Sequence, residues 1–330
     1  MEKYVEKFSY SKLNVYEQCP FKYKITYVDH NYIDLPSIAA DFGTLIHYIE
    51  EYMGNEIIKN NTLNYDYIID LLMNINDDNA QGINILKQKY PVEFYEKDKN
   101  NENYEDKLNK YINNGITRLE KYLKDNPQIK LIYTEHPFEI NINDFIFKGI
   151  IDRIFYNEEE DVYIIEDIKT YNHEIKEEDL KVPLQFVLYC AALMKEFNSD
   201  VKLQCYYDLP LLGIKQLAGT SSNFVKRGLN KINKTLGKIY TNNFDPKPSP
   251  LCHWCIFSGT YKDQPEKAKN KCAYYSLWTK EDNKNYNVAH KWEGLEMHQE
   301  IISRMLKSEI KIENNTIILE NLNNRIMRRR

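Results

Sequence analysis

The pattern of hydrophobic and polar positions is clearest between residues 145 and 170, where the chain reads FIFKGIIDRIFYNEEEDVYIIEDIKT. Two apolar runs rich in β-branched and aromatic residues flank the polar, acidic stretch 157–161, which can continue neither run. The segment therefore predicts a β-hairpin with a loop of a few residues. We interpret the rest of the chain around this hairpin.

Three charged residues lie on otherwise apolar faces of the hairpin. The two-residue period puts Asp167 and Lys169 on the face of Ile165, and Asp152 falls on the face of Ile154. An unpaired carboxylate is costly in such surroundings. If the strands pair residues whose numbers sum to 319, Asp152 lies opposite Asp167, and like charges directly opposite destabilise a sheet. A divalent cation held by both carboxylates would compensate, and oxygen ligands suit Mg²⁺ or Mn²⁺.

Composition describes an ordinary soluble protein. With 330 residues, 42% hydrophobic and 28% charged, the chain can bury the core of one large domain or two modest ones. The net charge of −5 gives no global positive field, which counts against nucleic acid but leaves room for a local basic groove. No run of about 18 apolar residues appears, and the start MEKYVEKFSY lacks a signal peptide's apolar core. We therefore expect a cytoplasmic protein of a bacterial or phage-infected cell, with no membrane partner.

Two helices are predicted before the hairpin. The first, SKLNVYEQCPFKYKITYV, is capped by Ser9 or Ser11 and is kinked or restarted at Pro20. The second, DFGTLIHYIEEYM, is predicted to begin at Gly43, and it carries His47. On its own, this histidine is more typical of a core or surface position than of a ligand.

The remaining segments alternate between helix and strand. Residues 55–130, rich in Asn, Asp and Lys, have helical periodicity and predict a helical insertion. LIYTEHPFEINI predicts a strand that carries Glu135, and the helix after the hairpin places Gln185 and Tyr189 four residues apart on one face. VKLQCYYDLP predicts another strand. A basic helix follows from residue 221, and a solvated face explains its lysines better than a DNA surface does.

The cysteines point to a reducing compartment and a metal. Six in 330 residues are too few for a disulfide scaffold, and Cys252 and Cys255 form the C-x₂-C spacing typical of metal sites. Cys272 follows 17 residues later. His253 is an alternative ligand if zinc is bound. The other pair, Cys190 and Cys205, is interpreted as core.

The hairpin resembles that of the PD-(D/E)XK nuclease superfamily, whose core motif is an acid on one strand and acid-x-lysine on the next. The acids here would be Asp152 and Asp167, with Lys169 as the lysine and the backbone carbonyl of Ile168 as a further metal ligand. Ile151 stands where the name of the superfamily places proline. Other motifs have to support this resemblance, because a bare D…DxK is common by chance.

Those motifs are similar to the ones of RecB-like and AddB-like exonuclease domains. GTLIH matches the Gly-x-x-x-His pattern, which makes His47 a metal ligand. Gln185 and Tyr189 match a Gln-x-x-x-Tyr motif that orients the site and contacts DNA. Glu135 matches an acid that precedes the hairpin and can polarise a metal-bound water, although an exposed strand carboxylate explains it equally well. All these motifs occur in the family's order.

The opening SYSKLNVYEQCPFKYKITY also resembles these domains, and it implies an iron–sulfur cluster. Cys19 would be its first ligand, with Cys252, Cys255 and Cys272 as the others, enough for [4Fe–4S] or for zinc as the alternative. Family members place the third cysteine closer to the pair, so Cys272 is either a displaced ligand or a sign of a degenerate site.

The resemblance implies an α/β fold with a restriction-endonuclease-like core, a central mixed β-sheet flanked by helices. We expect this domain to span residues 1–275, with the insertion at 55–130 and a helical and strand extension at 276–330. The implied activity is Mg²⁺- or Mn²⁺-dependent hydrolysis of DNA by an exonuclease of recombination, repair or phage DNA metabolism. A helicase or recombination protein would be its partner, since the chain has no G-x-x-x-x-G-K-[ST] loop. The alternatives are a non-catalytic DNA- or protein-binding module and an endonuclease of the restriction or CRISPR-adaptation kind.

Overall fold

The structure is a computed structural model of the chain. Two units divide it: the first comprises Met1–Tyr10 and Leu35–Asn233, and the second comprises Ser11–Asp34 and Lys234–Arg330. Each is described by itself. The described residues are 7–272, apart from 99–100, 144, 181–182, 198–199, 221, 248, 250, 253–254, 259–264 and 270, together with 308–313 and 316–321.

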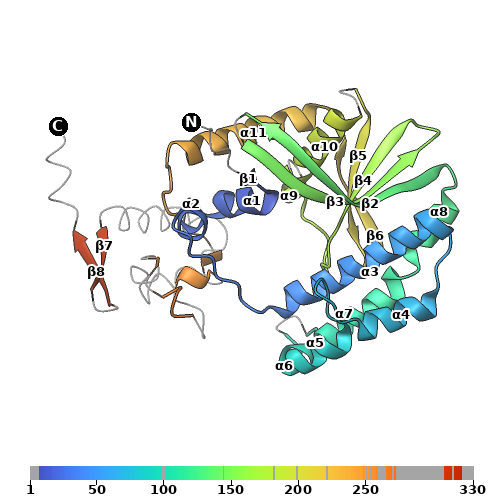
Figure 1. Cartoon of the computed structure of the whole chain (residues 1–330), viewed down its shortest axis with the longest axis horizontal. Helices are drawn as coiled ribbons and strands as arrows, with labels where there is room; N and C mark the ends of the chain where they lie inside the picture. Colours follow the sequence, from blue (N-terminus) through green and yellow to red (C-terminus); the bar gives the residue numbers. More distant parts are fainter. Residues whose placement is uncertain are drawn as a thin grey trace. The chain divides into compact units, whose positions relative to one another are not determined.

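A six-stranded mixed sheet lies at the centre of the first unit (Figure 1). Its order is β1-β3-β4-β5-β6, and β2 also pairs with β3. The β2–β3, β3–β4 and β5–β6 pairs are antiparallel, whereas β1–β3 and β4–β5 are parallel. The strands are β1 (Lys7–Phe8), β2 (Ile129–Ile142), β3 (Phe145–Asn157), β4 (Val162–Ile168), β5 (Leu203–Leu209) and β6 (Ile214–Thr220).

The predicted hairpin is β3–β4, and its predicted register is confirmed. Pairing runs from Arg153 opposite Glu166 to Asn157 opposite Val162, and each pair sums to 319. Asp152 and Asp167 therefore stand one step beyond the last pair. The strands predicted at β2 and β5 are also confirmed, whereas β6, with polar residues among its apolar ones, was not predicted.

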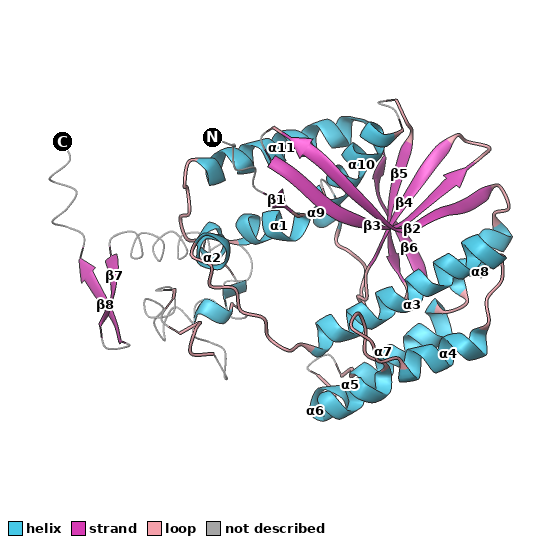
Figure 2. Cartoon of the chain, viewed as in Figure 1, coloured by secondary structure: helices cyan, strands magenta, loops and turns pink. Residues whose placement is uncertain are grey.

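One side of the sheet is covered by α3 and the helices that follow it before the hairpin (Figure 2). Apolar residues of α3 pack with Phe155 and Ile164 in one core cluster. The predicted insertion is helical. The helices on this side are α3 (Ile38–Asn60), α4 (Tyr65–Asn74), α5 (Ile83–Lys89), α6 (Pro91–Tyr95), α7 (Tyr104–Lys110) and α8 (Arg118–Asp125), with a π-helical turn at Tyr111–Gly115.

The predicted start of α3 at Gly43 is wrong. The helix begins at Ile38, because the side chain of Ser37 caps it by accepting a hydrogen bond of 3.4 Å from the backbone N–H of Ala40. The extra turn and a half leaves Gly43 inside the helix. His47 consequently sits in the third turn of a long, well-anchored helix.

The other side of the sheet is covered by α10 (Leu184–Glu196), which follows the short α9 (Glu177–Leu180). Phe186 packs edge-on against Tyr207 of β5, with ring centroids 4.8 Å apart. Cys190 and Cys205 are buried with their sulfurs 3.4 Å apart, as expected of core residues. The sheet is thus flanked by helices on both faces, and the predicted fold class is confirmed.

The second unit begins with α1, which starts at the unit boundary (Tyr10–Gln18), followed by α2 (Pro20–Tyr23) and a π-helical turn at Lys24–Val28. Cys19 has an extended backbone between α1 and α2, so the predicted restart at Pro20 is confirmed. The basic helix is α11 (Ser222–Tyr240).

Toward the C-terminus the elements are a 3-10 turn (Ile256–Ser258) and a two-stranded sheet in place of the single predicted strand, with β7 (Ser308–Glu313) and β8 (Thr316–Asn321). The helical part predicted for 276–330 lies outside the described residues. Within the described part of the chain, no helix combines the length and hydropathy needed to cross a membrane.

Candidate active site

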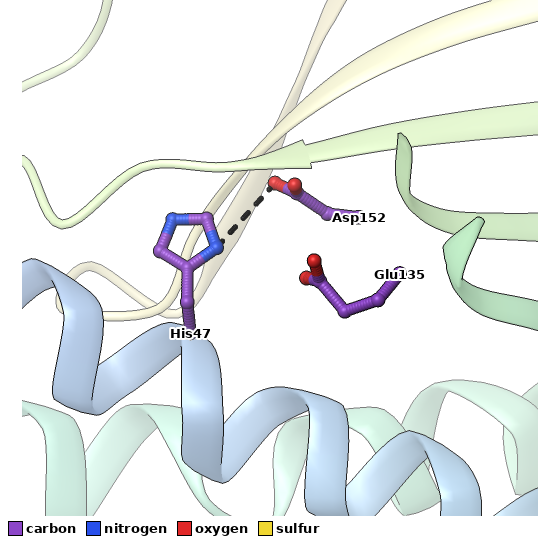
Figure 3. A group of neighbouring side chains, drawn as sticks. All are labelled: His47, Glu135 and Asp152. Carbon is purple, nitrogen blue, oxygen red and sulfur yellow. Dashed lines mark ion pairs between the residues drawn. The ribbon is translucent and has the colours of Figure 1, made fainter. Parts of the chain in front are cut away.

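Three side chains from three elements converge at the sheet surface: His47 of α3, Glu135 of β2 and Asp152 of β3 (Figure 3). One ligand atom of each lies within 4.8 Å of the other two. His47 Nδ1 is 3.7 Å from Asp152 Oδ2. Among the described residues, this is the group of His, Cys, Asp and Glu side chains close enough to hold one metal ion.

Glu135 reaches the site through an unusual backbone conformation. It lies directly opposite Asp152, between the pairs Thr134–Arg153 and His136–Ile151. Its φ is 47°, in the left-handed region that side chains with a Cβ rarely adopt. Pairing on both sides holds the residue there, and such strain is typical of functional positions. No sequence pattern announces this conformation, which is why the sequence left the role of Glu135 open.

Asp167 and the lysine two residues later form a second group with the predicted Gln and Tyr of α10. Lys169 Nζ lies 2.5 Å from Asp167 Oδ2, and Tyr189 donates its hydroxyl hydrogen to Asp167 Oδ1 at 3.3 Å. Gln185 Nε2 donates to the Tyr189 oxygen at 2.7 Å, and Lys169 donates to Gln185 Oε1 at 3.5 Å. The ion pair between Lys169 and Asp167 and these three hydrogen bonds link the four residues in a ring.

The hairpin joins the two groups. The backbone N–H of Ile168 donates to Asp152 Oδ2 at 2.6 Å, so the contact that the structure shows for Ile168 is made by its N–H. Asp167, predicted as a ligand, is turned toward Lys169 and Tyr189. Glu135 completes the three-ligand cluster where the sequence pattern suggested Asp167.

Burial and like charges set the protonation of the cluster. Burial raises the pKa of Asp152 well above its usual range, and the charge of Asp167 raises it further. Burial, followed by the charge of Glu51, raises the pKa of Glu135 to about 7. Burial and then the positive charge of Lys169 lower the pKa of His47. The two carboxylates are unfavourable as anions without a compensating positive charge, and the neutral imidazole beside them has a lone pair to donate. Such a set of donors fits a divalent cation.

The shifted pKa of Glu135 predicts how pH changes the stability of the metal-free protein. Between the usual pKa of 4.5 and about 7, the folded protein holds a proton that the unfolded chain has lost. The free energy of unfolding should therefore fall as pH rises through this window and stay low above it. We expect Glu135→Gln to remove this part of the slope, so that the variant gains stability over wild type from pH 5 to pH 8.

Urea unfolding in chelator gives the free energy of unfolding of both proteins. The difference between the two values at each pH cancels the titration of groups that the proteins share. One is Asp208, whose pKa burial raises to about 6. Parallel curves for the two proteins would contradict the assignment.

A buried ionic cluster lies on the opposite face of the hairpin. Arg153, next to Asp152, donates from Nη2 to the backbone oxygen of Glu50 at 3.1 Å and to its carboxylate. Its Nη1 donates to Asp208 Oδ2 at 3.3 Å, and Arg118 pairs with the same carboxylate. Glu50, Arg153 and Asp208 are at most 1% exposed.

This ionic cluster was missed by the sequence analysis. Alternation alone places Arg153 on the apolar face of Ile151 and Phe155, which is a readable signal of a buried cation. Arg118 gives no such signal, because a charged residue on an amphipathic helix usually faces water. The cluster is completed by Glu166, which pairs with Lys215.

Four cysteines meet in the second unit. They line one pocket with Phe21, Ile25 and Phe257 among its apolar walls. Burial raises the pKa of the Cys252 thiol to about 12, and the nearby Cys19 and Cys255 add to the rise. Thiolates here would need a cation to compensate them. His253 lies outside the described residues. The four are Cys19, Cys252, Cys255 and Cys272.

The predicted basic helix, α11, exposes five cationic side chains to solvent: Lys226, Arg227, Lys231, Lys234 and Lys238.

Comparison with known proteins gives a family. A model of the PD-(D/E)XK nuclease superfamily matches residues 7–260, which include every residue of the candidate active site. A crystal structure of a Eubacterium rectale protein, provisionally described as an exonuclease, is 14% identical, with a TM-score of 0.43 and coverage of 78% of this chain and 90% of that chain. A crystal structure of SSO0001 is 15% identical, with a TM-score of 0.27 and coverage of 74% and 95%. No curated protein matches.

Proposed function

This chain belongs to the PD-(D/E)XK nuclease superfamily, and from that premise we propose that it hydrolyses phosphodiester bonds of DNA with Mg²⁺ or Mn²⁺. The observation that carries the proposal is the convergence of His47, Glu135 and Asp152 within 4.8 Å, beside the Lys169–Asp167 pair. A cation site and a positioned ammonium group can together stabilise the charge that develops on a phosphate under attack.

We assign the cation to His47, Glu135 and Asp152, with Asp167 as the further ligand that the sequence motif implies. When bound, the ion supplies Lewis-acid stabilisation of the charge that develops on the phosphate. Asp152 is held for this task by the N–H of Ile168, which fixes the orientation of its carboxylate.

Lys169 supplies the positive charge of the protein itself. Burial opposes its charged form, but Asp167 outweighs burial and raises the pKa of Lys169, so the ammonium group persists at neutral pH. We assign it to orienting the attacking water and to neutralising the phosphate. Gln185 and Tyr189 contact Lys169 and Asp167 and thereby keep both in place.

Lys169→Ala should reduce cleavage of DNA by at least about 100-fold, the loss typical of removing one preorganised charge stabiliser. Purified protein would be incubated with linear and circular, single- and double-stranded DNA plus Mg²⁺ or Mn²⁺, beside a chelator control. Lys130→Ala is the matched control, because this lysine forms an exposed ion pair with Glu158 on the surface of the sheet. We expect Lys130→Ala to cleave like wild type.

The substrates decide among the candidate functions. We favour an exonuclease of DNA recombination, repair or phage DNA metabolism, served by a helicase or recombination partner in the cytoplasm, and it should degrade linear DNA only. Cleavage of circles would instead support a restriction or CRISPR-adaptation type of endonuclease. If no substrate is cut with either metal, the nuclease proposal fails and a DNA- or protein-binding module replaces it.

For the four-cysteine pocket we propose a [4Fe–4S] cluster with a structural role, since Cys19 lies far along the chain from the other three. The resemblance of the opening segment to AddB-like domains favours iron–sulfur. Zinc, which four thiolates can also bind tetrahedrally, is the alternative.

Protein purified without oxygen should be brown and contain about four iron atoms per chain. Cys19→Ala should lose the iron and lower the melting temperature far more than it lowers cleavage. Cys190→Ala is the matched control, since this buried cysteine lies outside the pocket. Metal analysis that finds zinc, or iron retained in Cys19→Ala, would refute the assignment.

A further inference from the structure

The chain that leaves the active site carries two exposed aromatic rings. Tyr171 stands two residues after Lys169, and its side chain is 44% exposed. Its ring stacks on that of His173, with centroids 5.5 Å apart and planes inclined by 21°. Large rings that face water singly are ordinary, but a stacked pair next to a catalytic lysine offers a flat surface at the place where substrate must arrive.

The loop that carries these rings is anchored on both sides. Asn172, between the rings, donates to Glu102, a buried carboxylate that Lys110 also holds. Two residues beyond His173, Ile175 donates its N–H to Gln216 Oε1 at 2.8 Å and accepts from Gln216 Nε2 at 2.7 Å. These bonds fix the backbone while the two rings face outward.

The rings themselves are also restrained. His173 Nδ1 lies 3.0 Å from the backbone oxygen of Glu174 and donates its hydrogen to it. The rings are therefore held in place before any ligand binds, so stacking a base on them costs little side-chain entropy.

The rings lie close to the reacting groups. Two residues of chain span at most about 7 Å, so Tyr171 is within that Cα distance of Lys169.

We propose that Tyr171 and His173 form a stacking platform for an unpaired nucleobase of single-stranded DNA, next to the phosphate that is cleaved. The proposal rests on the proposed nuclease function and names its substrate class. A flat ring can receive a base only when that base has left the stack of a duplex. The platform therefore selects single-stranded or frayed ends over internal duplex.

Binding of a short fluorescein-labelled single-stranded oligonucleotide, with Ca²⁺ in place of Mg²⁺, tests the platform by anisotropy. Tyr171→Ala should raise the Kd by about 5- to 100-fold, the range found when a stacking ring is removed. Tyr171→Phe should bind like wild type, because it keeps the ring. An abasic oligonucleotide of equal length and charge should bind wild type and Tyr171→Ala equally.

Tyr67→Ala is the matched control. This tyrosine of α4 is 48% exposed and its ring lies 5.5 Å from that of Tyr52, so it repeats the exposure and ring contact of Tyr171 within the helical insertion. We expect it to leave the Kd unchanged. The platform would be overturned if Tyr171→Ala and Tyr67→Ala bound the base-bearing strand with equal affinity. It would also be overturned if Tyr171→Ala weakened binding of the abasic strand as much as binding of the base-bearing strand.

Failure of the platform and failure of the nuclease function give different results. If Tyr171→Ala cleaves DNA and binds it with wild-type affinity, the nuclease proposal stands and the platform proposal fails. If the protein binds in a base-dependent way but cuts nothing with Mg²⁺ or Mn²⁺, the platform proposal is supported and the nuclease proposal fails.

Discussion

Asp152→Asn should raise the stability of the metal-free protein while lowering DNA cleavage by at least about 100-fold, since even residues that only support a metal ligand cost up to that factor when lost. The two registers, continued through Asp152, place Glu135 and Asp167 opposite it, and like charges directly opposite destabilise a sheet. The amide removes this repulsion, and its oxygen can still accept the Ile168 N–H. About 1 kcal/mol corresponds to about 2–4 °C in Tm for a domain of this size.

Thermal unfolding in chelator, and again with Mn²⁺, measures the effect. Mn²⁺ should raise the Tm of wild type and leave that of Asp152→Asn unchanged, because only wild type binds the ion in its folded state. Glu50→Gln is the matched control: Glu50 is buried too, and burial opposes its charge, but Arg153 and Arg118 outweigh burial and lower the pKa of its carboxyl. At pH 8 its loss should destabilise. If both variants lose stability alike, Asp152 is a structural residue and the metal site is wrong.

Arg153→Met should destabilise the protein by about 3–5 kcal/mol, the cost of leaving buried charges without their partner. Arg153 is 1% exposed and compensates Glu50 and Asp208, both fully buried. Once it is removed, these carboxylates must stay unpaired in the core or take up protons. Chemical denaturation of the metal-free protein at neutral pH gives the change in the free energy of unfolding.

Lys148→Met on the same strand provides the comparison, because Lys148 pairs with Glu139 at the surface, where both side chains are about half exposed. We expect it to cost at most about 1 kcal/mol. The double variant Glu50→Gln/Arg153→Met should recover part of the loss, since opposite charges leave the core together. Equal costs for Lys148→Met and Arg153→Met would show that the buried cluster contributes no more than a surface pair.

The cluster also explains how the active site keeps its geometry. Glu50 and His47 lie three residues apart on α3, while Arg153 and Asp152 are adjacent on β3. The Arg153–Glu50 contact therefore joins α3 to β3 at positions close in sequence to His47 and Asp152. On β5, Asp208 accepts from Arg153 through its carboxylate, and its backbone oxygen accepts from the N–H of Lys169 at 2.8 Å.

The hairpin was predictable because its information is local. Apolar alternation and an acidic turn fix the strands, and one register keeps every apolar residue on its proper face, so the juxtaposition of Asp152 and Asp167 follows from sequence. The motif order likewise placed His47, Gln185 and Tyr189 on helices beside it. The start of α3 was missed because a serine cap outweighs the apparent break at Gly43.

What the sequence by itself determined is which residues carry charge on apolar faces, and in which strand and helix each one stands. Only the tertiary structure decided which of them come together in a group that could hold a cation. Glu135 enters the cluster through a left-handed backbone that sheet pairing on both sides imposes, and Asp167 turns to Lys169 and Tyr189 because α10 packs across that face. Both outcomes depend on contacts between elements distant in sequence, and periodicity within one element contains no information about such contacts.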